Sequence, residues 1–278
     1  MVFKIRGRET TKEKLMTLEP EILRALIRER THHTIEVLIY PIIYGRRPHP
    51  PRFGEEVRVL LDIWRERELS LSEPDIVWAS RYLELAERIR RGETPELDTK
   101  IVKPFEEREM EVVKNLIFGR RSIRQWKKER VPDWMINEII KAGLAAPNAC
   151  NLQCQRFLVL TDEESMSIIK GDVPLPPVKI VICQDMRIYE WMGFLESAPQ
   201  NIYFDAAAAA DHMLLMAHAL GLGGVWLTHT RDQAERLRKH LRLPDYYRMD
   251  THIAVGWPDE APIKSARMPH EHAIIRVQ

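Results

Sequence analysis

The sequence has few cysteines and no excess of charge of either sign. Only 3 of its 278 residues are cysteine, at positions 150, 154 and 183. This odd and sparse set argues against a disulfide framework and favours reduced thiols in a cytoplasmic protein. The 42 basic and 41 acidic side chains balance each other, and neither half of the chain forms a basic arm. We therefore do not expect a nucleic acid as partner.

The sequence also lacks a long uninterrupted apolar run. Its first residues, MVFKIRGRETTKEK, contain no apolar segment of the kind found in signal peptides. The longest apolar stretch, residues 206–227, is interrupted by Asp211, His212 and His218. Polar and charged residues in the middle of the stretch indicate a buried helix of a soluble protein and not a membrane span. We expect a soluble intracellular protein without a membrane partner.

A glycine-rich dinucleotide fingerprint of the G-x-G-x-x-G type is absent. The GLGG segment at 221–224 ends a predicted helix instead of opening one. Apolar and β-branched runs predict five strands, at residues 156–160, 178–183, 224–228, 251–256 and 273–277. Since the strands do not alternate regularly with helices, the pattern favours an α+β sandwich over a Rossmann sheet.

A predicted linker at residues 93–104, which contains Pro95 and Pro104, divides the chain. The first part, residues 1–104, is predicted to be a helical extension, and residues 105–278 the main domain. The extension could be a lid, a dimerisation element or a partner-docking surface. Residues 34–44 are either a helix end or an extended piece. The predicted helices cover residues 19–30, 55–68, 74–91, 105–118, 132–146 and 231–241.

Three arginines stand within five residues at the start of the main domain. Arg120, Arg121 and Arg124 flank the hydroxyl of Ser122. Guanidinium groups offer planar forks of donors, so the cluster is a plausible clamp for a phosphate dianion. The alternative is a solvated charge run that caps a helix.

The order of several motifs resembles the flavin-dependent nitroreductase family. The motifs are Arg-Arg-Ser-x-Arg at 120–124, Ala-Ala-Pro-Asn-Ala-x-Asn-x-Gln at 145–153, a long helix and strand over 205–226, IAVGWPDEAP at 253–262, and Arg267. The resemblance covers roughly residues 110–278. It implies a nitroreductase-like three-layer sandwich, in which helices flank a central mixed or antiparallel sheet.

The resemblance also implies an FMN site. Arg120, Arg121, Ser122, Arg124 and Arg267 would hold the ribityl phosphate, and the flavin would lie at the interface of a homodimer. The ring would be contacted by Pro147, Asn148, Ala149, Asn151 and Gln153, and by the backbone around Leu227, Thr228 and His229. The chain departs from the family at Gln153-Cys154-Gln155, where Gln-Pro-Trp is usual, and at Asn148, where Ser is common. Turn chemistry is the alternative role for the two asparagines.

Residues 185–201 are the predicted substrate lid. Tyr189, Trp191 and Phe194 would stack on an aromatic substrate, and Glu190 or Arg187 would supply charge. Alternatively, this is a surface helix whose aromatic residues pack on the core. His229 could protonate a reduced product or could be a core histidine. The spacings of Cys150 with Cys154, and of His270 with His272, do not indicate a metal site.

The predicted function is an FMN-dependent oxidoreductase. Hydride would pass from NADH or NADPH to an electron-poor small molecule, such as a nitroaromatic or a quinone, by a ping-pong mechanism. No side chain is assigned as catalytic, because the flavin carries the hydride. The alternatives are a reductive dehalogenase of the same family, a flavin-binding module that docks a partner through the N-terminal helices, and an enzyme that consumes FMN as a substrate.

Overall fold

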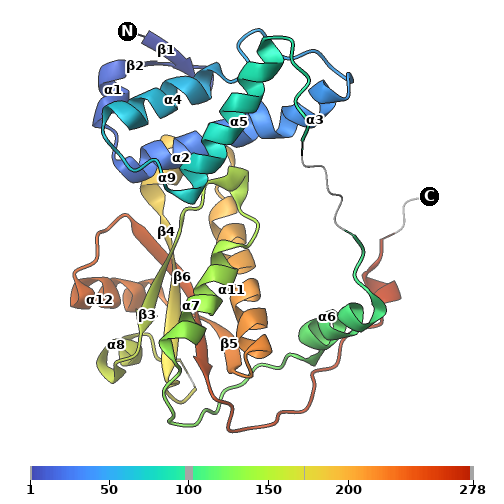
Figure 1. Ribbon diagram of the computed structural model, residues 1–278. Coiled ribbons are helices and arrows are strands. Elements are labelled where there is room, and N and C mark those ends of the chain that lie inside the picture. The colour runs from blue at the N-terminus through green and yellow to red at the C-terminus, as the bar shows by residue number, and fades with distance from the viewer. Residues whose placement is uncertain (1, 98–102, 172, 276–278) are drawn as a thin grey trace.

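A computed structural model describes residues 2–97, 103–171 and 173–275 (Figure 1). An N-terminal group of helices lies against one end of a sandwich built on a β-sheet, and the helix α6 (Glu107–Gly119) projects away from both. No helix in these described ranges is long and apolar enough to cross a membrane.

Four antiparallel strands form the central sheet, in the order β3-β4-β6-β5. They are β3 (Gln155–Leu160), β4 (Val178–Asp185), β5 (Gly223–Thr228) and β6 (Tyr247–Gly256). Four of the predicted strands are therefore confirmed. The β6 strand begins before the predicted Thr251. Its first part is not predicted because the charged residues Arg248 and Asp250 interrupt the apolar pattern; in the structure they form an ion pair of 2.6 Å with each other.

Helices cover both faces of this sheet (Figure 1). The pair α7 (Asp133–Leu144) and α11 (Asn201–Ala219) packs on one face, and the pair α8 (Glu163–Ile168) and α12 (Arg231–Leu241) on the other. Side chains alternate along a strand, so Ile180 of the wholly buried β4 faces α11 whereas Val181 faces α12. The predicted α+β three-layer sandwich is confirmed.

The predicted fifth strand is not formed in its described part. Residues His270–Ala273 make a short 3-10 turn, η3, and the following residues up to 275 belong to no strand. Ile275 is 93 % exposed, so its apolar side chain lies on no neighbouring strand. Residues 276 and 277 of the prediction lie outside the described residues.

The N-terminal region is more varied than the predicted helical extension. It opens with a hairpin of β1 (Val2–Ile5) and β2 (Arg8–Thr11), joined by Arg6 and Gly7 at positive φ. The sequence shows little sign of this hairpin because most of its side chains are polar or exposed. The remaining elements are α1 (Lys12–Thr17), α2 (Pro20–Thr31), the π-helix η1 (His32–Glu36), α3 (Val37–Ile43), α4 (Glu55–Glu66) and α5 (Pro74–Arg90).

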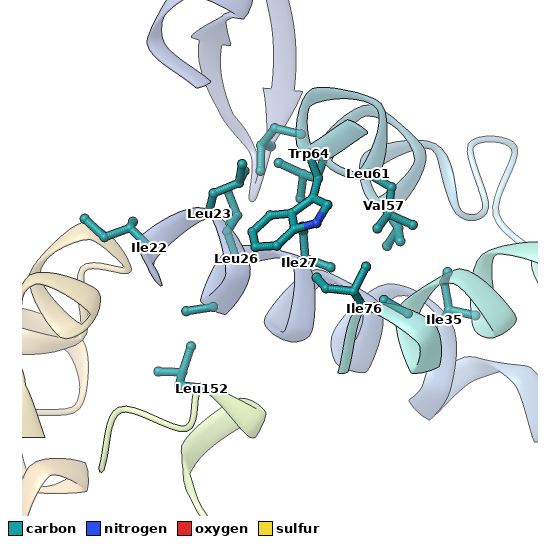
Figure 2. Packing of buried hydrophobic residues seen from close by; sticks show 14 of the residues in the cluster. Ile22, Leu23, Leu26, Ile27, Ile35, Val57, Leu61, Trp64, Ile76 and Leu152 are labelled. Carbon is teal, nitrogen blue, oxygen red and sulfur yellow. The ribbon is translucent and has the colours of Figure 1, made fainter. Parts of the chain in front are cut away.

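The hydrophobic core of these helices continues into the sandwich. Apolar residues of α2, α4 and α5 pack together, and Leu152 from the loop before β3 lies below α2 in the same cluster (Figure 2). The cluster also takes in residues from α9 (Met186–Trp191) and the start of α11. Residues before and after position 104 therefore share one core.

The helix α6 has no buried residue. Its N-terminus is stabilised by a reciprocal capping box between Glu106 and Glu109. Val112 and Phe118 are exposed by 64 % and 61 %. In Figure 1, α6 and the short turn η3 lie beside each other, away from the sheet. An amphipathic helix owes most of its stability to packing, and the described residues bury none of the apolar side chains of α6.

Candidate cofactor site

The arginine cluster is fixed by pairing with the start of β5. Ser122 forms a parallel bridge with Gly224, and the Ile123 N–H donates to the Gly224 carbonyl at 3.2 Å. Ile123 packs so closely on Gly223 that a Cβ added there would lie 2.7 Å from its side chain. The glycines at 223 and 224 therefore allow the cluster to lie directly against the sheet.

A cavity of about 480 Å³ opens beside this cluster. Arg120 and Arg121 line it together with His218 of α11 and Glu260. The Nη1 atom of Arg120 is buried and has no hydrogen-bond partner among the described residues. A buried charged donor without a partner is costly, and an anion such as a phosphate oxygen would satisfy it. The residues present therefore fit the phosphate of FMN.

Glu260 organises the backbone of the cluster. Its Oε1 accepts hydrogen bonds from the Arg124 N–H and, at 3.1 Å, from the Gln125 N–H. No role is predicted for Glu260 from the sequence, although it lies within the resembling motif at 253–262. Its carboxylate lines the same cavity as Arg120, so the cavity carries both signs of charge.

Arg124 and Arg267 lie outside the set of described residues that line this cavity. The Arg124 side chain is exposed and donates to the Ser122 carbonyl at 3.4 Å. Arg267 is exposed and donates to the Ala266 carbonyl at 3.2 Å. Within one chain, the structure brings together Arg120 and Arg121 but not the other two arginines.

The predicted ring-contacting loop has an unusual backbone. Cys150, Asn151 and Gln153 all have positive φ, between 51° and 55°, a region that non-glycine residues seldom adopt. The Asn148 Oδ1 accepts from the Gln153 N–H at 2.9 Å, and the Gln153 amide donates to Asn151 Oδ1 at 2.9 Å. Asn148 thus performs the turn role that sequence reasoning left open.

Asp205, which sequence reasoning missed as a site residue, anchors this loop to α11. Its Oδ1 accepts from the Ala149 N–H at 2.9 Å, and its Oδ2 accepts from the Tyr189 hydroxyl. Asp205 is buried, and burial raises the pKa of its carboxyl even though both hydrogen bonds lower it. An acidic residue at the start of an alanine-rich helix is the only signal for this role in the sequence.

The loop and the arginine cluster lie at opposite ends of α11. Asp205 holds the loop at one end, while His218 lines the arginine cavity at the other. A helical rise of 1.5 Å per residue places these two positions about 20 Å apart. One chain therefore does not bring the two halves of the predicted site together.

Leu227, Thr228 and His229 form the end of β5 and the residue after it. The His229 ring turns into the protein, where its Nδ1 lies 3.1 Å from Nδ1 of His252. Burial lowers the pKa of His229. The structure thus favours the interpretation of His229 as a core histidine. Its ring is engaged inside the protein, so at this position the backbone is the part that remains for contact with a cofactor.

Residues 185–201 are docked on the N-terminal region. Tyr189 is 0 % exposed and its hydroxyl is bonded to Asp205, so neither face of its ring is open to a substrate. Trp191 and Phe194 are half-buried against the N-terminal core, and the Arg6 guanidinium lies 5.1 Å from the Phe194 ring. Glu190 is exposed. The aromatic residues of the predicted lid therefore pack largely on the core.

A model of the nitroreductase family matches residues 117–192 and 177–257, which together make more than half of the chain. The chain belongs to the nitroreductase family. The predicted resemblance is confirmed, and residues 1–116 lie outside the family match.

Individual nitroreductase relatives agree with this membership. A Methanothermobacter thermautotrophicus protein with a provisional NADH dehydrogenase/NAD(P)H nitroreductase name is 28% identical over 195 residues, covering 67% of this chain and 91% of its own. A Desulfovibrio desulfuricans protein solved with FMN is 30% identical, with a TM-score of 0.50 over 60% of this chain and 96% of that one. The NADPH:FMN oxidoreductase from Vibrio harveyi, complexed with NAD+, is 26% identical, with a TM-score of 0.51 over 59% of this chain and 76% of that one.

Proposed function

We propose that this nitroreductase-family protein is an FMN-dependent oxidoreductase that passes hydride from NADH or NADPH to an electron-poor small molecule. The observation that carries the proposal is the buried, unpartnered Nη1 of Arg120 in the cavity beside the cluster. An unsatisfied guanidinium donor fits a phosphate group. The relative solved with FMN and the relative named as an NADPH:FMN oxidoreductase support FMN as the source of that phosphate.

The protein's own residues would bind and orient the cofactor. Arg120 and Arg121 would hold the phosphate, and the loop of Asn148, Asn151 and Gln153 would meet the polar edge of the ring. Bound FMN supplies the hydride chemistry that no side chain can perform. The backbone at Thr228 and His229 would lie beside the ring, since the His229 side chain is engaged with His252.

The proposed site is shared by two copies of the chain. The arginine cluster and the loop lie at opposite ends of α11, so a second copy is needed to complete each site. The exposed apolar side chains of α6, and Phe204 on α11, supply an exposed apolar surface for it. This supports the expected homodimer. The three cysteines are unpaired, which supports a reducing, cytoplasmic location.

Electron-poor nitroaromatics and quinones are the proposed acceptors. Donor and acceptor would use the same open face of the ring in turn, which gives ping-pong kinetics. A reductive dehalogenase receives less support, because the lid residue Tyr189 is buried and bonded to Asp205. The role of the N-terminal region as a docking surface for another protein receives no specific support from its contacts.

An absorbance spectrum of the purified protein tests the proposal. We expect a flavin spectrum that bleaches on anaerobic addition of NADH or NADPH and returns when a quinone is added, with FMN as the released cofactor. Parallel lines in double-reciprocal plots would support the ping-pong mechanism. A colourless protein that does not take up added FMN, or bound flavin that neither donor reduces, would contradict the proposal.

A further inference from the structure

The N-terminal helices contact the sandwich at the predicted ring-contacting loop. Both α2 and η1 pack against η2 (Ala149–Asn151), the 3-10 turn within that loop. The Nε2 atom of His33, from η1, lies 3.7 Å from Cys150 Sγ. Leu152 is fully buried below α2 (Figure 2). The loop is thus held by a part of the chain that the family model does not cover.

A buried arginine makes the most direct link across this junction. Arg28 of α2 is only 4 % exposed. Its Nη2 donates to the Leu152 carbonyl at 2.6 Å, and its Nη1 donates to Asp75 Oδ2 of α5 at 2.7 Å. A buried guanidinium is tolerated only when it is paired and hydrogen-bonded. Asp75 supplies the opposite charge at Nη1, and Nη2 holds the loop, while the buried Nε has no partner among the described residues.

Asp75 is ionised throughout the physiological range. Burial raises the pKa of its carboxyl, but hydrogen bonds from Arg24 and Arg28 outweigh burial and lower that pKa to about 2. The Asp75–Arg28 pair therefore stays intact near neutral pH.

The loop needs support from outside because its own conformation is unfavourable. The loop contains three non-glycine residues with positive φ within four positions: Cys150, Asn151 and Gln153. Each such residue raises the free energy of the folded state, and surrounding contacts must offset this. Asp205 fixes the loop at Ala149, and Asn148 fixes it at Gln153. Arg28 fixes the carbonyl of Leu152, between these two points.

We infer that Arg28 is a positioning residue that holds the 148–153 loop in the conformation required for FMN, which makes the N-terminal helices a built-in part of the cofactor site. The inference rests on the proposed function. It predicts that the loop loses its conformation, and the protein its affinity for FMN, when the link between Arg28 and Leu152 is removed.

Arg24 provides a matched control. It lies one helical turn before Arg28 and binds the same carboxylate, with Nε 2.8 Å from Asp75 Oδ2 and Nη2 2.6 Å from Oδ1. Its hydrogen bonds within the described residues go to Asp75 and Glu73 and not to the loop. Arg28→Ala leaves Asp75 paired with Arg24, and it removes the bond to Leu152 together with the packing of a buried side chain.

Two measurements on the full-length protein test the inference. The first is the rate at which iodoacetamide alkylates Cys150 in FMN-free protein, located by mass spectrometry, with the buried Cys154 and Cys183 as slow internal references. The second is the Kd for FMN from a fluorescence titration. In Arg28→Ala we expect Cys150 to react about tenfold faster and the Kd to rise about tenfold, while Arg24→Ala stays within about twofold of wild type.

Thermal unfolding confirms that each variant is folded. If Arg28→Ala does not fold, Arg28→Lys is compared with Arg24→Lys. Lysine keeps a cation at the junction but lacks the second arm of the fork, so a Kd raised in Arg28→Lys alone supports the inference.

The opposing outcomes are distinct. A folded Arg28→Ala with wild-type alkylation and wild-type Kd overturns the inference while the proposed function stands. Faster alkylation with an unchanged Kd also overturns it, because the loop then does not set the affinity. Equal losses in the Arg24 and Arg28 variants overturn it in favour of general destabilisation. Wild-type protein that binds no FMN overturns the proposed function and the inference together.

Discussion

The ring of His229, just after strand β5, meets the ring of His252 in the neighbouring strand β6, with their Nδ1 atoms 3.1 Å apart. The Nε2 of His229 lies 3.2 Å from the Met249 carbonyl, which can only accept, so this nitrogen carries the proton. The Nδ1 of His229 must then accept from Nδ1–H of His252. Burial lowers the pKa of both rings, that of His252 to about 3, so both are neutral at pH 7.

This pair predicts a loss of stability in mild acid. The folded pKa of His252 lies below its ordinary value of 6.5, so the unfolded chain binds the proton more tightly. The stability is therefore fully present above pH 6.5 and is lost as the pH falls toward 3. Between pH 7 and pH 5, protonation of His252 in the unfolded chain should lower the free energy of unfolding by about 2 kcal/mol.

Urea unfolding of wild type and His252→Leu at both pH values should show a smaller loss of this free energy in the variant. An equal loss would contradict the buried neutral pair, and the exposed His270→Gln serves as control.

Close packing at Gly143 predicts that even a methyl group is harmful there. A Cβ at this position would lie 2.8 Å from Met213 Cγ and 2.9 Å from Phe157 Cζ, where α7 crosses α11. Overpacking of this kind destabilises by about 1–3 kcal/mol, and alanine regains about 0.5–1 kcal/mol inside a helix. Gly143→Ala should therefore lower the free energy of unfolding by up to about 2 kcal/mol. Gly171→Ala, with nothing within 4 Å, is the control. A Gly143→Ala protein as stable as wild type would show that the helices can move apart freely.

The phosphate clamp predicts loss of cofactor in arginine variants. Arg120→Ala removes a charged donor worth about 1.5–3 kcal/mol, so the Kd for FMN should rise roughly 10- to 100-fold in a folded protein. We expect the same direction for Arg267→Ala, which a second copy or closure of the terminal segment would bring to the phosphate. The exposed Arg236 of α12, paired with Asp232, provides the control substitution to alanine. Full FMN occupancy in Arg120→Ala would contradict the clamp.

The exposed face of α6 predicts a dimer that a single charge can disrupt. Phe118 is 61 % exposed, and burying an added carboxylate in an apolar interface is strongly unfavourable. Phe118→Asp should therefore sediment as a monomer and retain little FMN. Val37→Asp, on α3 of the N-terminal region and 48 % exposed in the wild type, should remain dimeric. A monomeric wild type that binds FMN would contradict the shared site.

Much of the sandwich could be predicted from the sequence. The strand at 178–183 is apolar or β-branched except at Lys179, the strand at 224–228 has the same character, and the helix at 231–241 begins and ends as predicted. The order of the Arg-Arg-Ser and Pro-Asn-Ala motifs also predicted the family, which the family match confirms. These features are local, so the pattern of neighbouring residues encodes them. The division of the chain at residue 104 stays a prediction.

The contacts that organise the candidate site are not local. Arg28 and Leu152 are 124 positions apart, and no periodicity indicates that they meet. Asp205 carries no motif that links it to Ala149, and Tyr189 has the aromatic character of a lid residue although it is buried. The predicted strand at 273–277 shows the converse case. Its apolar residues have the composition of a strand, but the residues of this segment that the structure describes pair with no other strand.

The shared core imposes an order on biosynthesis. Ribosomes deliver about 5–20 residues per second, so α2 waits roughly 6 to 25 s after Arg28 emerges before Leu152, 124 positions later, can reach it. During that interval the apolar faces of α2 and α4 have only the N-terminal elements as partners, without Leu152 and the rest of the shared core, and closing so long a loop slows the final step. The beginning of this chain therefore finishes folding only after its middle has been made, and a nascent chain truncated before residue 150 should be a preferred target of chaperones and proteases.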